Sequence, residues 1–154
     1  MENSDWKQNL ADFFEDRKVI GHCRKETVEN FAQFCEFIAE PAFESLEDEL
    51  RKYNVKSKTR KSKNKLIDFQ INFPGSRIDH FHYIIRLPRN VIELKLKLQI
   101  KARMNKNESL EKREEAFMEK VKPQELLKLP KEAIIQDVIE HYKNFTYRTI
   151  AQSE

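Results

Sequence analysis

Two histidines separated by a single residue could together bind a metal ion. His80 and His82 fall in a stretch where apolar and polar residues alternate, which is typical of a β-strand. Side chains two residues apart on a strand point the same way at about 7 Å, so both imidazoles can reach one metal. A site needs a third ligand, and no motif places any of the candidates, which are His22, His141, Asp68 and Glu93. We therefore expect the pair to lie on the solvated face of a sheet, with a metal-dependent enzyme as the third alternative for function.

Candidate nucleophiles and cofactor loops are scarce. The chain contains only Gly21 and Gly75, whereas a phosphate-cradling loop built on repeated glycines needs more. A P-loop and a dinucleotide-binding turn are therefore excluded, and we expect no cofactor. Cys35 lies on an apolar helical stripe, where a buried and unreactive thiol is expected. The serines lack the glycine context of a nucleophile elbow. These observations favour a binding protein over an enzyme.

The strongest functional signal is a basic segment at residues 56–65, which places six cations within ten residues. Its Ser, Thr and Asn side chains can donate to phosphate oxygens, but it has no aromatic ring on which a base could stack. We expect it to contact phosphates without reading bases, and the positive character continues through Arg86 and Lys101 on a polar sheet face. The candidate anion-binding or nucleic-acid-binding residues are Lys56, Lys58, Arg60, Lys61, Lys63, Lys65, Lys95 and Lys97. The alternative interpretation is a solvated segment whose lysines protect a sheet edge from aggregation.

Charge is distributed unevenly, although the net charge is only +3. Residues 1–50 carry 5 basic and 13 acidic side chains, whereas residues 51–65 carry 8 basic side chains and no acidic one. Such an asymmetry is informative about partners and not about the fold. It predicts an anionic partner at the basic centre, or docking between acidic and basic protein surfaces.

The cellular setting follows from what the chain lacks. No apolar run approaches the roughly 18 residues needed to cross a membrane, so we expect no membrane partner. The acidic, polar start does not resemble a secretion signal. Cys23 and Cys35 do not have metal-binding spacing, and we interpret them as reduced thiols of a cytoplasmic protein.

The elements that would position these residues follow from hydrophobic periodicity. Gly21 is expected to end the first helix and Pro41 to kink the second. The predicted helices cover about 5–20, 25–53, 108–121 and 131–148, and alternating residues between about 65 and 102 predict three strands, with a fourth if residues 53–59 pair at the edge. All 154 residues are thus predicted to form one α+β domain, a three- or four-stranded antiparallel meander with N- and C-terminal helices packed on one face.

The same alternation predicts which side chains are buried. Exposure is expected for Gln70, His82, Lys95 and Lys97. Burial is expected for Phe69, Ile71, Tyr83, Ile85, Leu94, Leu96 and Leu98.

The predicted second helix has more apolar surface than one sheet face requires. Phe34, Phe37 and Phe43 lie off its main apolar stripe, and surplus apolar surface often marks an interface. Packing under a neighbouring helix would explain the same rings. We predict a binding or adaptor protein that contacts either another protein or a second copy of itself in a homodimer. Sequence-independent nucleic-acid binding through residues 56–65 is the alternative.

Overall fold

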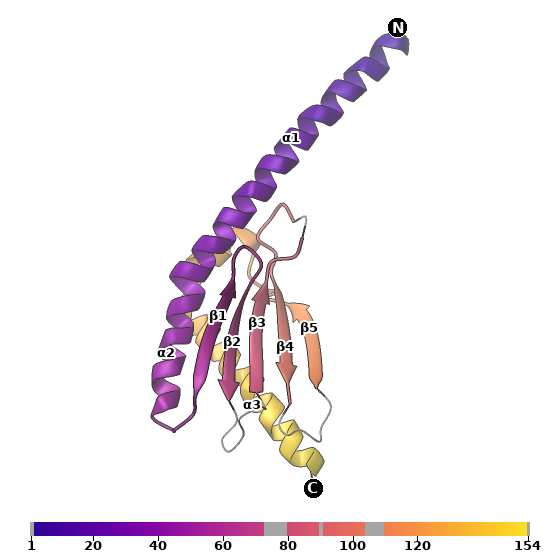
Figure 1. Cartoon of the computed structure of the whole chain (residues 1–154). Helices are drawn as coiled ribbons and strands as arrows, with labels where there is room; N and C mark the ends of the chain where they lie inside the picture. The colour runs from indigo at the N-terminus through magenta and orange to yellow at the C-terminus, as the bar shows by residue number, and fades with distance from the viewer. Residues whose placement is uncertain (1, 73–79, 90, 104–109, 154) are drawn as a thin grey trace.

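The chain folds as α+β, with one antiparallel sheet and helices before and after it (Figure 1). The structure is a computed structural model that describes residues 2–72, 80–89, 91–103 and 110–153, with side chains described from Asp5 to Tyr147 within these ranges. The helical elements are α1 (Glu2–Phe34), the π-helical turn η1 (Cys35–Ala39), α2 (Glu40–Arg51), the 3₁₀ helix η2 (Pro123–Lys128) and α3 (Lys131–Ser153). The strands are β1 (Ser57–Ser62), β2 (Leu66–Asn72), β3 (His80–Arg86), β4 (Lys97–Ala102) and β5 (Glu111–Ala116). They lie in the order of the sequence, from β1 to β5.

The first helical region is continuous from Glu2 to Arg51, so the prediction that a helix ends at Gly21 is wrong. A glycine inside a helix costs only about 1 kcal/mol relative to alanine, and its neighbours have enough helical propensity to continue through it. The predicted irregularity before Pro41 takes the form of η1, where the Glu40 N–H donates to the Cys35 carbonyl five residues back. This wider turn accommodates a proline that cannot donate a backbone hydrogen bond. Figure 1 shows α2 continuing from α1 with a bend at this point.

Within the described residues the sheet has five strands, where three or four were predicted. The fourth strand, expected if residues 53–59 paired at the edge, is present as β1, which is part of the basic segment and pairs with β2 from Ser57 opposite Ile71 to Ser62 opposite Leu66. At the other edge, β5 replaces the predicted helix at 108–121, of which residues 108 and 109 lie outside the described residues. The sequence of β5 has no apolar periodicity, and its extended form comes from pairing with β4. Both edge strands are rich in charged side chains, which is typical of protected sheet edges.

The core lies between one face of the sheet and the helices α2 and α3. Phe43 of α2 stacks on Phe69 with ring centroids 4.8 Å apart, and Phe81 contacts Tyr142 of α3 at 5.3 Å. Burial is confirmed for every predicted core residue, namely Phe69, Ile71, Tyr83, Ile85, Leu94, Leu96 and Leu98.

Among the side chains predicted to be exposed, Lys95 and Lys97 are exposed and His82 is partly buried. Gln70 is only 6% exposed, so its prediction is wrong. The residue lies in β2, in the middle of the sheet between Lys58 of β1 and His82 of β3, and its amide donates to Asn72 Oδ1 at 2.8 Å. A polar position in the middle of a sheet can thus be buried by its neighbours even on an uncovered face.

The first half of α1 extends beyond the sheet (Figure 1). Every described side chain from residue 5 to residue 22 is exposed, whereas Thr27, Phe31 and Phe34 are buried. The helix therefore packs onto the sheet and its neighbours only from about Thr27 onward. None of the helices in the described ranges is both long enough and apolar enough to cross a membrane.

Candidate anion-binding surface

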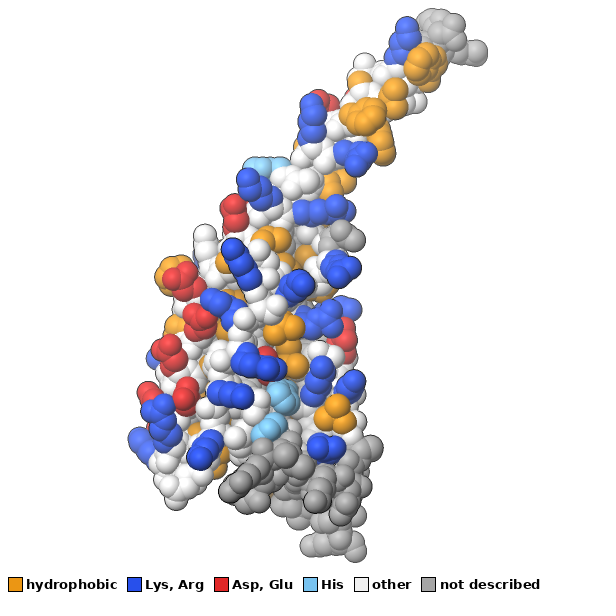
Figure 2. Space-filling view, viewed as in Figure 1, with side chains coloured by type: hydrophobic (Ala, Val, Ile, Leu, Met, Phe, Trp, Pro, Cys, Tyr) orange, Lys and Arg blue, Asp and Glu red, His pale blue; other side chains and the backbone are white. Residues whose placement is uncertain are grey.

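The sheet face opposite the core, which we call the open face, carries mostly basic side chains. Figure 2 views the molecule from this side and shows Lys and Arg side chains spread over the strands, with acidic side chains concentrated along α2. Strand register places these open-face residues on β1 to β5, because alternate residues point to opposite faces. Its charged members along the five strands are Lys58, Arg60, Asp68, Arg86, Lys97, Lys101, Lys112 and Glu114.

The two acids of the open face are paired with local cations. Asp68 is 5% exposed, and its carboxylate lies 3.5 Å from Arg60 Nη2 and 3.1 Å from His82 Nδ1. Glu114 Oε1 lies 3.1 Å from Lys97 Nζ. The remaining cations of the face, Lys58, Arg86, Lys101 and Lys112, are in excess over these acids. The open face therefore attracts anions.

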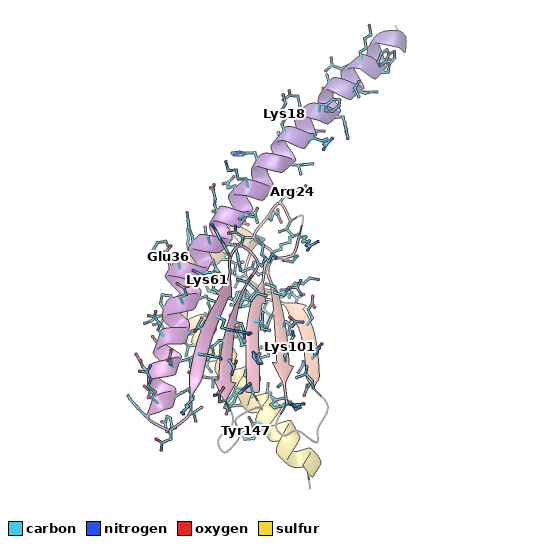
Figure 3. The ribbon with its side chains drawn as sticks, viewed as in Figure 1. Lys18, Arg24, Glu36, Lys61, Lys101 and Tyr147 are labelled. Atoms are coloured by element: carbon cyan, nitrogen blue, oxygen red, sulfur yellow. The ribbon has the colours of Figure 1, made fainter. Side chains whose placement is uncertain are left out.

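At one end of the open face, where it meets α1, the surface forms a hollow of about 810 Å³, which we call the basic hollow. This volume is within the range of about 300–1,000 Å³ that is typical of ligand sites. Its cationic lining comes from α1, the β1–β2 turn, β3, the segment after β3, and β4. These residues are Arg24, Lys63, Lys65, Arg86, Arg89 and Lys101. In Figure 3, Arg24 lies where α1 leaves the sheet and Lys101 lies on the strand face toward the viewer.

The described lining of the basic hollow combines cationic and apolar side chains. No acidic side chain is present among its described lining residues, and none of its six cations forms an ion pair within the described part of the chain. Its apolar residues are Val28, Leu66, Leu87, Pro88 and Val91, and its described lining contains no aromatic ring. Cations that converge on one concave site without an ion-pair partner can each donate a hydrogen bond to a phosphate oxygen. The absence of a ring leaves no platform for base stacking in that lining.

The eight cations predicted from the sequence do not lie on one surface. Lys58, Arg60 and Lys97 lie on the open face, with Lys56 just before β1, and Lys63 and Lys65 line the basic hollow. Lys61 lies on the core side of β1, where its Nζ is 2.9 Å from Glu40 Oε1, and this hydrogen bond raises the pKa of the lysine. Lys95 pairs with Glu93 at 3.4 Å. Four of the eight therefore already have an acidic partner, namely Arg60, Lys61, Lys95 and Lys97.

Sequence reasoning missed two cations of the basic hollow. Arg24 lies in α1 and Arg89 in the connection between β3 and β4, and neither belongs to a basic run. They join Lys63 and Lys65 only because the tertiary fold brings α1, the β1–β2 turn and the β3–β4 connection together. No local signal in the sequence could have identified them.

The histidine pair lies on the open face, at the N-terminal end of β3. The rings of His80 and His82 lie 6.0 Å apart on the open face, as the strand geometry predicts, and His82 contacts Asp68. Within the described residues there is no group of three or more His, Cys, Asp or Glu side chains that could hold a metal ion. His22 lies on the projecting part of α1 and His141 on α3, both far along the chain from the pair.

A second polar cluster lies on the core side of the sheet. His141 of α3 has Nδ1 2.8 Å from the Asp137 carbonyl and Nε2 2.7 Å from Glu115 Oε1. The Tyr83 hydroxyl donates to Asp137 Oδ2 at 2.6 Å. Burial, with the negative charge of Asp137 beside it, raises the pKa of Tyr83 well above its ordinary value. The phenol therefore stays protonated and serves as a donor that ties β3 to α3.

Three of the remaining residues that the sequence singled out are buried in the core, namely Cys35, Phe34 and Phe43. Burial raises the pKa of Cys35 to about 12, so this thiol stays protonated and unreactive at neutral pH. Phe34 and Phe43 are fully buried within the chain, in contact with Phe117 and Phe69 respectively, and are not accessible to a partner. Of the three rings predicted to form an interface, only Phe37 is on the surface, at 68% exposure.

No family model matches the chain, and neither a curated protein nor a solved structure is significantly similar to it.

Proposed function

We propose that this protein binds the phosphate backbone of nucleic acid, with the basic hollow as the main contact and the open face as its continuation. The observation that carries the proposal is the convergence of six cations, with no acid and no ion pair among the described lining residues, on one hollow. Bringing like charges together costs free energy in the absence of a counter-charge. A bound polyanion would repay that cost.

An extended polyanion fits the surface better than a small anion does. Cations continue from the basic hollow along the strands through Arg60 and Lys58 in one direction and toward Lys112 in the other. A chain of phosphates can contact such a surface at several points, whereas a single phosphate uses two or three cations. The cytoplasmic setting expected from the sequence, where nucleic acid is abundant, is part of this proposal.

Edge protection, the alternative interpretation of the basic segment, explains fewer of the residues. Lysines on β1 would protect the edge of the sheet, but Arg24, Arg86 and Arg89 are not on an edge strand. The absence of an aromatic ring in the described lining favours binding that is indifferent to base sequence. Contact with another protein, which the sequence also predicts, is favoured by a different surface, the projecting part of α1.

The test is fluorescence anisotropy with a labelled single strand and a labelled duplex at low salt. We expect both to bind, with little dependence on base sequence. A variant carrying Arg86→Ser and Lys101→Ser should bind at least about tenfold more weakly, since it loses two charge-assisted contacts.

The matched control carries Lys128→Ser and Lys143→Ser, which remove the same charge from η2 and α3, outside the open face. Its affinity should stay close to that of the unaltered protein. Equal losses in the two variants would mean that only overall charge matters, and no binding by the unaltered protein at low salt would refute the proposal.

A further inference from the structure

The projecting half of α1 carries an apolar stripe that no other described part of the chain covers. The stripe consists of Trp6, Leu10, Phe13, Phe14 and Ile20, which are between 38% and 56% exposed. Their spacing, in steps of four, three, one and six residues, places them along one side of the helix. Figure 2 shows hydrophobic side chains along this part of the molecule. The stripe is in phase with Thr27, Phe31 and Phe34, so the side of α1 that is buried at its base is exposed toward its tip.

Charge along this part of α1 changes sign between its tip and its base. From residue 5 to residue 16, four acids, Asp5, Asp12, Glu15 and Asp16, accompany the single cation Lys7. From residue 17 to residue 25, Arg17, Lys18, Arg24 and Lys25 occur without an acid. Such a surface is complementary to a copy of itself that runs in the opposite direction.

We propose that the projecting half of α1 pairs antiparallel with the same half of a second copy of this chain. Alignment of Leu10 with Ile20 of the other copy also places Phe13 opposite Arg17 and Trp6 opposite Arg24. A two-fold axis generates each of these contacts twice. Arginine over an aromatic ring is a favourable pair, and within one copy the Arg17 guanidinium already lies 6.0 Å from the centre of the Phe13 ring. The acidic tip of each helix then lies beside the basic base of the other.

The position of the domain determines the antiparallel direction. At its base, α1 meets the segment around Ile92 and the helix η2, which line a hollow of about 370 Å³ together with Cys23 and Thr27. A parallel partner helix that followed the stripe would run into this part of the domain, and it would face Arg17 with Arg17. An antiparallel partner in this register ends where Glu2, the first residue of α1, lies opposite Val28. The residues 5–25, whose side chains are described, overlap over a length of about 30 Å.

The size and charge of the stripe fit a reversible dimer. Each of the three rings has roughly half its surface exposed, and together they offer on the order of 300 Å² per copy. Leu10, Ile20 and the aliphatic stems of Arg17 and Arg24 add to this area. The total surface buried in the dimer then approaches about 1,200 Å², the lower limit for a specific interface. A helix that lies on an anionic membrane has a basic polar face, whereas residues 5–25 carry 5 basic and 4 acidic side chains. This near balance favours a second copy as the partner.

Sedimentation equilibrium of the full chain without nucleic acid tests the proposal. The unaltered protein should rise from the monomer mass of 18.5 kDa toward twice that mass between low and high micromolar concentration. Leu10→Glu should raise the dissociation constant at least about a hundredfold, because each dimer contains the change twice. The control is Val19→Glu, an equally drastic change at a side chain that is 59% exposed on the opposite side of the same helix. It should leave the dissociation constant unchanged.

The direction of pairing is measured with spin labels on single cysteines in a Cys23→Ser background, since Cys35 is buried. In the antiparallel pair, labels at residue 5 lie about 30 Å apart along the axis, whereas labels at residue 16 lie close together. A parallel pair brings both sets close together. A monomer at all concentrations, a dimer that Leu10→Glu does not weaken, or a close approach at residue 5 would each overturn the proposal. Because no nucleic acid is present, none of these results depends on polyanion binding.

Discussion

The Tyr83 hydroxyl donates a 2.6 Å hydrogen bond to Asp137, 54 positions further along the chain. Tyr83 is completely buried and lies in the central strand β3, whereas Asp137 is partly exposed on α3. The bond therefore joins the middle of the sheet to the helix that covers it. The Tyr83 ring also contacts Phe43 of α2 edge-on at 6.2 Å. One side chain thus links the sheet to both covering helices.

Replacement of Tyr83 by phenylalanine should keep the packing and remove only this bond. We expect a loss of about 1.5–3 kcal/mol in the free energy of unfolding at neutral pH, because the acceptor is a carboxylate. Tyr147→Phe, at a ring that is 64% exposed, should change it by less than about 0.5 kcal/mol. Thermal and urea melts measure both values. Equal stability of Tyr83→Phe and the unaltered protein would show that the bond contributes nothing.

The same substitution should change the pH dependence of stability. Burial raises the pKa of Tyr83 above that of a tyrosine in the unfolded chain, which is about 10. The folded state therefore holds its proton when the unfolded state has lost it, and stability is lost as the pH rises above about 10. Urea melts at alkaline pH should show a shallower loss for Tyr83→Phe than for the unaltered protein.

Phe43 and Phe37 belong to the same helical region, but only one of them supports the fold. Phe43 is fully buried between Phe69 and Tyr83, whereas Phe37 is 68% exposed. Phe43→Ala should cost about 3–5 kcal/mol through lost burial and the cavity that remains, and Phe37→Ala less than about 0.5 kcal/mol. Denaturant melts of the two variants measure the difference. Similar costs for both would contradict the assigned packing.

The sequence predicted those strands in which apolar and polar residues alternate regularly. Strict alternation in β2, β3 and β4 identified the strands and their buried face, because a shift of one residue would expose Phe69 and Tyr83. The strand β5 could not be predicted in this way. Its residues Glu111–Ala116 have no apolar period, and they are extended because they pair with β4. Long-range pairing of this kind leaves no local signal.

The candidate site was predictable where it coincided with a run of charge or with the alternation of a strand. Lys63 and Lys65 stand in the basic segment, and strand alternation places Arg86 and Lys101 on the open face. Arg24 and Arg89 are isolated in the sequence, and only the packing of α1 beside the sheet brings them to the basic hollow. The burial of Phe34 and Phe43 depends in the same way on Phe117 and Phe69, which lie in distant segments.

The salt dependence of nucleic-acid affinity should report how many cations of the protein contact phosphates of the ligand. If all six cations of the basic hollow neutralise phosphates, the slope of log affinity against log salt should be about −4 for a single strand, from about 0.7 per contact. The same six contacts on a duplex would give about −5, from about 0.9 per contact. Arg86→Ser with Lys101→Ser should make the single-strand slope shallower by about 1.4, because two contacts are lost. Lys128→Ser with Lys143→Ser should leave it unchanged, since those lysines lie outside the open face. Anisotropy titrations over a series of salt concentrations give these slopes, and an unchanged slope in the first variant would place the bound phosphates elsewhere on the molecule.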